Sequence, residues 1–340
     1  MVKLLVYLAI ALVVIAASQL MRVFELASQL KGERRDEYTH KDFQRQGRMF
    51  MVFLIGFFAF CLWQCIKYKN DLLPMAASDQ GVELDWLFWF NMIIIGIVSI
   101  IVNWVLFYMC YKYYSRPDAT AVFYPHNNKL ELLWTIVPAV VLAVIIVLGI
   151  RLWSNITAPA PADSIVIELY AKQFDWTARY AGKDNQLGRS TYKLIEGANA
   201  LGMDSTDEKG WDDMVVKNEI HIPIGKTVEF KINSRDVIHS VFLPHFRAQI
   251  NAVPGMTTSL HFVPTITTEV MRTHPEVIDQ VTRINAIRAL KGEDVYVFDY
   301  VLLCNKICGA SHYNMQMNIV VDTPEQYEAF IAKQKTFFKK

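Results

Sequence analysis

The sequence predicts a membrane-anchored protein in two parts, with four transmembrane helices followed by an all-β domain in water. Two kinds of observation support this fold class. The chain has 340 residues, of which 53% are hydrophobic and 20% charged, a balance too apolar for an ordinary soluble enzyme and too charged for a pure membrane bundle. All of its long apolar runs lie before residue 154, and alternating, strand-like runs follow.

Four apolar runs are each long enough to cross roughly 30 Å of hydrocarbon as a helix. They cover residues 2–20, 49–66, 88–110 and 132–153. The loop between the first two runs is strongly basic, whereas the next loop carries only Lys67 and Lys69. Its basic residues are Arg22, Lys31, Arg34, Arg35, Lys41, Arg45 and Arg48. Because cytoplasmic loops are enriched in Lys and Arg, we expect this loop inside the cell and both the N-terminus and the β domain outside.

The first apolar run also has features of a cleaved signal peptide, since Lys3 precedes it and "AASQ" follows it. Cleavage would leave the basic loop on the outer side and the β domain in the cytoplasm. We therefore favour a retained first helix, which predicts no processing after Ser18.

The β domain begins after the linker in "RLWSNITAPAPADS". The runs "SIVIELYAKQFDWTARY" and "TVEFKIN" alternate β-branched and polar residues, as strands do. Residues 181–215 are polar and Gly-rich, more typical of a loop than of a core. Residues 276–291 predict a short helix within the domain, and "TPEQYEAFIAKQKTFF" opens with a good helix start.

The stretch "LLCNKICGASHYNMQM" gathers four soft or borderline metal ligands in the pattern Cys-x3-Cys-x3-His-x2-Met. These are Cys304, Cys308, His312 and Met315. A structural zinc site uses Cys and His but no thioether, whereas thiolate and thioether together select copper. A single electron-transfer copper needs one thiolate, while two neighbouring cysteines can bridge two copper ions, each of which needs its own imidazole.

The other three cysteines lie in apolar runs, so a disulfide framework is improbable. They are Cys61, Cys65 and Cys110. The Cys61–Cys65 pair has the same spacing as Cys304–Cys308, but no histidine or methionine partner lies near it in the sequence. We interpret it as lipid- or helix-facing packing in a membrane helix.

A second imidazole must come from elsewhere in the β domain. In "SRDVIHSVFLPHF", His239 follows a strand-like run, and His245 is the competing choice. Spacing favours His239, but it leaves open that both are ordinary surface histidines.

Several stretches together resemble subunit II of the haem-copper cytochrome c oxidases. They are "LELLWTIVPAVVLAVI", "DVIHS", "AVPGM" and "CNKICGASHYNM", and the resemblance covers about residues 88–325. It implies a cupredoxin-like Greek-key barrel that carries a binuclear copper centre, CuA. The implied ligands are the bridging Cys304 and Cys308, the terminal His239 and His312, the weak ligand Met315 and the backbone carbonyl of Lys306.

The resemblance also implies a function. A bacterial subunit of this kind, here with two extra N-terminal helices, accepts electrons from a cytochrome c-type donor. It passes them to the haems of subunit I, where oxygen is reduced and protons are pumped. We expect a multi-pass protein of the bacterial cytoplasmic membrane, with the CuA domain on the periplasmic side and with subunit I and other oxidase subunits as partners. No Cys-x2-Cys-His motif occurs, so no haem is expected in this chain, and its charge pattern gives no argument for nucleic acid.

Four further side chains can be compared with the family, and two of them depart from it. The family's aromatic patch for electron transfer from the donor corresponds to Phe174 and Trp176, where the first residue is usually a tryptophan. Glu131 corresponds to a carboxylate at the mouth of a proton path into subunit I. The residue at Lys306 is typically a glutamate that reaches a magnesium ion, so magnesium bound through this chain is not expected.

Residues next to His239 bear on the donor. Arg235 beside Asp236 replaces two carboxylates that the family often has, so electrostatic steering of a basic soluble cytochrome should be weak. We therefore expect a tethered or complex-bound donor.

The sequence thus predicts four segments. They are residues 1–67 with two additional helices and the basic loop, 68–155 with the family's helix hairpin, 156–325 with the CuA domain, and 326–340 with a C-terminal helix and tail. A membrane-anchored copper carrier or sensor is the alternative function. It would explain the ligands but not the similarity of the helices or Glu131.

Overall fold

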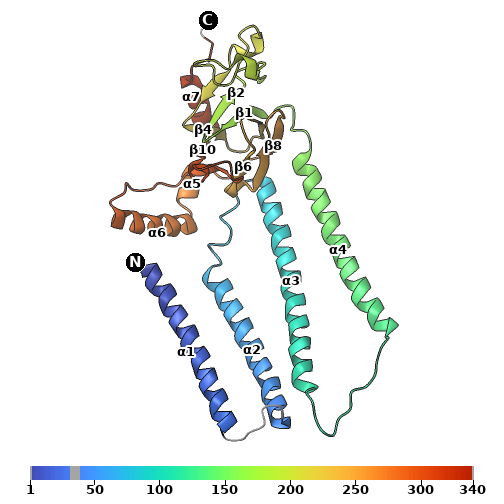
Figure 1. Ribbon diagram of the computed structural model, residues 1–340. Helices are drawn as coiled ribbons and strands as arrows, with labels where there is room; N and C mark the ends of the chain where they lie inside the picture. Colours follow the sequence, from blue (N-terminus) through green and yellow to red (C-terminus); the bar gives the residue numbers. More distant parts are fainter. Residues whose placement is uncertain (1, 31–38, 339–340) are drawn as a thin grey trace. The chain divides into compact units, whose positions relative to one another are not determined.

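The computed structural model describes residues 2–30 and 39–338 (Figure 1). Its four long helices are α1 (Val2–Leu30), α2 (His40–Lys67), α3 (Asp79–Lys112) and α4 (Asn128–Thr157). All four are long and apolar enough to cross a membrane, which confirms the four predicted spans. The helices exceed the apolar runs because polar turns at their ends continue the backbone hydrogen bonding. Part of the basic loop, including Lys31, Arg34 and Arg35, lies outside the described residues.

The chain divides into two compact units, one made of Met1–Lys67 with Gly96–Asn127 and the other of Tyr68–Ile95 with Asn128–Lys340. In the first unit, α2 packs on the second half of α3. The rings of Phe50 and Phe53 each lie 5.8 Å from that of Phe107. A Cβ on Gly47 would lie 3.2 Å from the Tyr111 Cα, so glycine permits this close approach.

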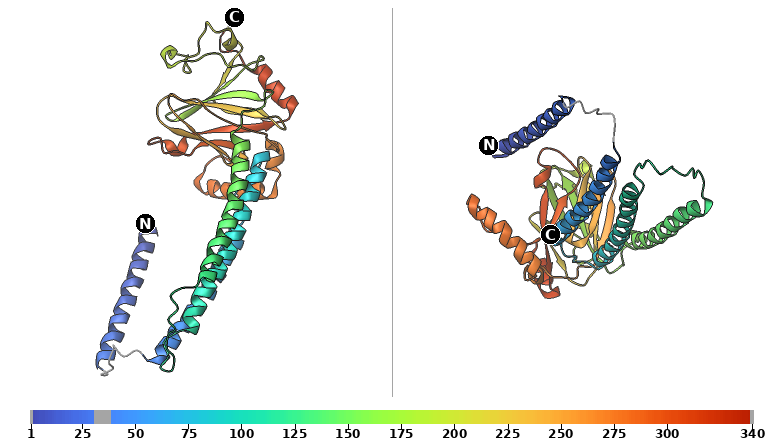
Figure 2. Two further views of the ribbon diagram at one scale, coloured as in Figure 1. Left: turned by 90° about the vertical axis from the view of Figure 1, so that its right-hand side faces the viewer. Right: turned by 90° about the horizontal axis from the view of Figure 1, so that it is seen from below.

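The second unit contains ten strands in two five-stranded sheets (Figure 2). One sheet has the order β3-β2-β1-β5-β8 and the other the order β4-β10-β9-β6-β7. The strands are β1 (Ile165–Lys172), β2 (Asp175–Tyr180), β3 (Met214–Val216), β4 (Glu219–Pro223), β5 (Val228–Ser234), β6 (His239–Leu243), β7 (Ala248–Ala252), β8 (Thr258–Phe262), β9 (Tyr300–Cys304) and β10 (Gln316–Asp322). β1 pairs in parallel with β5 and β10 with β4, while the other pairs are antiparallel. This architecture confirms the predicted cupredoxin-like β domain.

One apolar core fills the space between the sheets because inward residues alternate along the strands. In β5, Val228, Phe230 and Ile232 are buried, and the residues between them are partly exposed. The same alternation in β9 buries Leu302 and Cys304. The end of β9 therefore aims the first cysteine of the ligand motif into the domain.

Helices α5 (Thr268–Arg272) and α6 (Pro275–Lys291) are inserted between β8 and β9, and α7 (Pro324–Lys333) follows β10. Figure 1 shows α6 to one side of the strands. Thr323 caps α7 in a reciprocal capping box with Gln326, and α6 ends at Gly292, whose φ is 68°. Both predicted helices of the β domain are confirmed.

The segment predicted as a polar loop, residues 181–215, contains only two short 3₁₀ helices (Tyr192–Leu194 and Glu208–Gly210) before β3 begins at Met214. It also buries Leu201 and Met203. The segment thus contains buried apolar side chains that its polar composition did not predict.

Candidate metal centre

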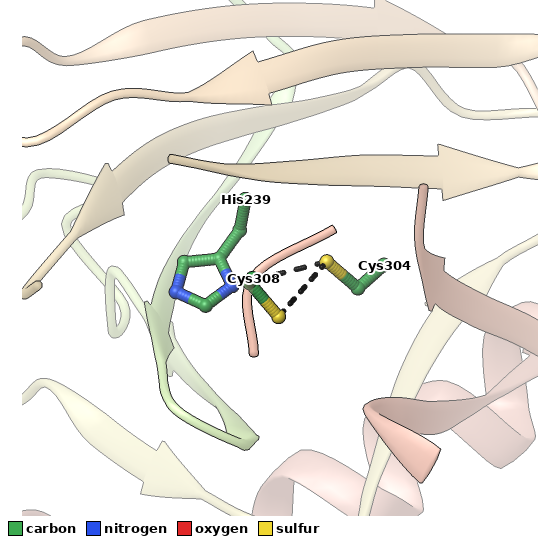
Figure 3. Close-up of side chains that lie close together, drawn as sticks. All are labelled: His239, Cys304 and Cys308. Carbon is green, nitrogen blue, oxygen red and sulfur yellow. Dashed lines mark hydrogen bonds between the residues drawn. The ribbon is translucent and has the colours of Figure 1, made fainter. Parts of the chain in front are cut away.

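A buried cluster of His239, Cys304 and Cys308 lies at one end of the second sheet (Figure 3). Their ligand atoms all lie within 4.8 Å of one another. β6 and β9 are neighbours, with Val241 paired to Cys304, so the first residue of β6, His239, lies beside the end of β9. Strand pairing therefore joins residues that are 65 positions apart in the sequence.

The other predicted ligands surround the same two sulfur atoms. The Cys304 Sγ lies 3.8 Å from the Cys308 Sγ and 3.8 Å from the His239 Nδ1. The Cys308 Sγ lies 3.5 Å from the His312 Nδ1 and 3.8 Å from the Met315 Sδ. The Lys306 carbonyl oxygen lies 3.2 Å from the Cys304 Sγ. All six predicted ligand groups converge, each cysteine with its own imidazole.

This donor set fits soft metal ions. Burial and the neighbouring Cys304 raise the pKa of Cys308 to about 11, so a pair of thiolates here requires compensating positive charge. The donor set matches the ligand preferences of copper. It consists of two thiolates, two imidazoles, a thioether and a carbonyl, and it includes neither a third thiolate nor a carboxylate, which would favour another metal.

The sequence reasoning missed two residues that position the ligands, Asp236 and Gln173. The Asp236 carboxylate lies 2.8 Å from the His239 Nε2, so the ring can donate there and direct its Nδ1 lone pair to the metal side. Gln173 joins the two sides of the site, because its backbone N–H donates to Asp236 (2.7 Å) and its side-chain amide donates to the Cys308 carbonyl. The spacing Asp-x2-His in "RDVIH" was the only available signal.

The two aromatic residues expected at the donor patch lie in different environments. Trp176 is 0% exposed, and its ring lies 6.2 Å from that of His239, behind the ligand. Phe174 is partly exposed and packs over the metal loop: a Cβ on Gly309 would lie 2.8 Å from the Phe174 ring, and Gly309 has a φ of 144°. Only Phe174 is within reach of another protein.

Other candidate residues lie apart from the cluster. His245 packs edge-on against Phe298 and Tyr300, where burial lowers its pKa to about 4, so the structure brings His239 rather than His245 to the cysteines. Glu131 lies in the first turn of α4. Cys61, Cys65 and Cys110 are free cysteines on α2 and α3, and Cys65 and Cys110 are exposed.

Comparisons with known proteins show which family the chain resembles. Residues 63–152 match the family model described as cytochrome C oxidase subunit II, transmembrane domain, and residues 165–277 match that of the periplasmic domain of the same subunit. The alternative cytochrome c oxidase subunit 2 of Bradyrhizobium diazoefficiens is 31% identical over 72% of this chain and 77% of that protein. Cytochrome c oxidase subunit 2 of Thermostichus vulcanus is 25% identical over 78% of this chain and 79% of that protein. The crystal structure of the periplasmic domain of subunit II of cytochrome oxidase (CoxB) of Bradyrhizobium japonicum is 19% identical, covers 53% of this chain and all of that chain, and has a TM-score of 0.33.

Proposed function

Because the chain belongs to the cytochrome c oxidase subunit II family, we propose that its β domain holds a binuclear CuA centre that accepts electrons for a respiratory terminal oxidase. The observation that carries this proposal is the convergence of six ligand groups on two sulfur atoms 3.8 Å apart. The chain is a multi-pass membrane subunit of an oxidoreductase complex.

When bound, the copper pair would supply a one-electron redox site shared between two ions. Cys304 and Cys308 would bridge the pair, and His239 and His312 would each complete one side. Asp236 would fix the tautomer of His239 through a 2.8 Å contact. Strands β6 and β9 and the segment between β9 and β10 carry the ligand groups. A ligand set that moves little between redox states lowers the cost of electron transfer.

The remaining steps involve other chains. We propose that a cytochrome c-type donor contacts the surface around Phe174 and that electrons leave toward subunit I, where oxygen is reduced and protons are pumped. Glu131 would lie at the mouth of a proton path. The β domain and the N-terminus would lie on the periplasmic side of the bacterial inner membrane. The chain would consist of four segments, which are residues 1–67, 68–155, 156–325 and 326–340.

A copper carrier or sensor is the rival function, and spectroscopy of the purified oxidase complex distinguishes the two. We expect a near-infrared absorption band and an EPR hyperfine pattern that arise from one electron shared between two coppers. A stored Cu(I) ion gives neither signal, so their absence from a copper-loaded, active preparation would contradict the proposal.

The charges on the surface near the site predict that the association rate of a soluble donor depends only weakly on salt. Asp236 carries one negative charge, which the exposed guanidinium of the neighbouring Arg235 offsets. Little net negative charge therefore remains beside His239 to steer a basic cytochrome. We expect the on-rate of a free basic cytochrome c to change little between 20 and 200 mM salt (roughly twofold or less) by stopped-flow. A steep fall in that rate would argue for a freely diffusing basic donor instead of a tethered or complex-bound one.

Lys306 leads to a prediction about magnesium. Its ammonium is exposed and has no lone pair, so it cannot ligate a cation, although its carbonyl can still serve copper. We propose that magnesium is absent or held without this chain, and that Lys306 pairs with an acidic group of subunit I. Metal analysis of the wild-type complex and of Lys306→Glu should show magnesium gained in the variant with copper unchanged. Magnesium bound at the wild-type lysine, or a variant with intact copper and no gain, would refute this.

A further inference from the structure

A cavity of about 480 Å³ lies between the β-domain ends of α3 and α4, within one compact unit. Its walls are mainly apolar side chains of both helices, in stripes at helical spacing. They are Val82, Trp86 and Leu87 of α3 and Leu148 and Leu152 of α4. Trp86 is 58% exposed and stacks on Phe90 at 5.4 Å, a placement typical of tryptophans at a membrane–water interface.

The polar members of the wall carry both signs of charge. Glu83 comes from α3, and Arg151 and Asn155 come from α4. Glu83 and Asn155 also line a second, adjoining cavity of about 220 Å³, where Gln80 and His261 are further polar members. The apolar cavity thus continues into a polar one toward the β domain. Neither the Glu83 carboxylate nor the Arg151 guanidinium forms an ion pair within residues 2–30 and 39–338.

Contacts with the β domain fix both α3 and α4, the two helices that line the cavity. Asp79, at the start of α3, accepts from the Val263 N–H at 3.1 Å, and Asp85 pairs with Arg247 at 2.7 Å. The last part of α4 contacts β8, the strand that precedes Val263. The cavity is therefore a fixed feature of the helix–barrel junction.

We propose that these cavities bind one diacyl phospholipid whose headgroup carries a phosphodiester and a primary ammonium, as in phosphatidylethanolamine. An acyl chain would occupy the apolar cavity, where burial of each CH₂ is favourable. The Arg151 guanidinium and the Asn155 amide would donate to the phosphate, and Glu83 would accept from the ammonium. The site should discriminate against two other lipid classes. An anionic lipid without an ammonium would place its negative charge near the Glu83 carboxylate with no ammonium to offset the repulsion. A lipid with a quaternary ammonium has no N–H group that could donate a hydrogen bond to Glu83.

The test uses the complete oxidase complex, purified in mild detergent, delipidated and re-equilibrated with equal amounts of phosphatidylethanolamine, phosphatidylglycerol and phosphatidylcholine. Mass spectrometry counts the retained lipid of each class per complex. We expect wild type to retain phosphatidylethanolamine preferentially and Arg151→Gln to lose about tenfold in its affinity, as expected for a charge-assisted hydrogen bond. Glu83→Gln should keep lipid but lose the preference for the primary ammonium.

Arg116→Gln is the matched control, because Arg116 is an exposed arginine beyond the other end of α3 and lines neither cavity. Equal losses in Arg151→Gln and Arg116→Gln would overturn the proposal, because they would indicate a general charge effect. Wild-type complex that retains no phosphatidylethanolamine above the other two lipids would also overturn it, as would a helix of another subunit filling the cavity in a structure of the complex.

Discussion

Replacing Cys304 or Cys308, the two proposed bridging ligands, with serine should abolish the mixed-valence signal expected of the proposed copper pair and reduce oxidase activity to background. Serine conserves the size of Cys304 or Cys308 but offers a hydroxyl, which is a poor ligand for soft copper. Both side chains are buried, Cys304 beside the imidazole of His239 and Cys308 beside that of His312. EPR and near-infrared spectra of the purified complex, together with oxygen uptake, measure the effect.

The matched control is Cys65→Ser, which removes an exposed thiol from α2 with the same local spacing in the sequence. It should leave both the spectrum and the activity at wild-type levels. The Cys304 and Cys308 variants should still insert and assemble, which immunodetection in membranes would establish. A copper pair that survives either substitution would remove the basis for the proposed centre.

Most of the candidate metal site could be predicted because five of its six proposed ligand groups lie within residues 304–315. The Cys-x3-Cys-x3-His-x2-Met spacing keeps them together in any fold that closes the loop. His239 was harder, since its approach depends on the pairing of β6 with β9. The role of Gln173 could not be predicted, because its contacts reach Asp236 and Cys308 in two other segments. For Asp236, the spacing to His239 was the only signal.

The membrane spans were predictable because hydrocarbon requires long apolar helices. The strands were predictable in outline from their alternation, but alternation gave no sign that Glu168 and Arg179 would be buried. Charged residues at these positions of β1 and β2 suggest a solvent-exposed face, yet both are nearly fully buried. Their partner Asp213 lies in the segment whose polar composition predicted only a loop.

These three residues form a buried charge cluster on the outer side of the first sheet. The Arg179 guanidinium lies 2.7 Å from Glu168 and 3.5 Å from Asp213, and Glu168 also accepts from the Asn233 amide at 2.7 Å. Burial raises the pKa of Asp213 to about 6, and Arg179 opposes this shift. The guanidinium therefore compensates two carboxylates that have little access to water.

Arg179→Met should destabilise the protein strongly, because it leaves two buried carboxylates without a counter-charge. Breaking such a pair costs about 3–5 kcal/mol, or roughly 10 °C in Tm for a domain of this size. Thermal loss of the near-infrared copper band in the full complex would report it. Arg189→Met is the matched control, since Arg189 also pairs with two carboxylates, Asp204 and Asp207, but is 71% exposed; its Tm should change by about 2 °C at most.

The sign of the pH dependence separates this electrostatic cause from a packing defect. A carboxyl group whose pKa is raised in the folded state holds its proton more tightly there, so its contribution to stability is present at low pH and declines as the pH rises to that pKa. In wild type the decline due to Asp213 ends near its pKa of about 6. Removing Arg179 raises that pKa further and extends the decline, so the Tm gap between Arg179→Met and wild type should widen from pH 6 to pH 8. Adding Glu168→Gln and Asp213→Asn to Arg179→Met removes the unpaired carboxylates and should abolish this widening. If instead the Tm gap between Arg179→Met and wild type is constant with pH, lost packing and not unpaired charge causes the instability.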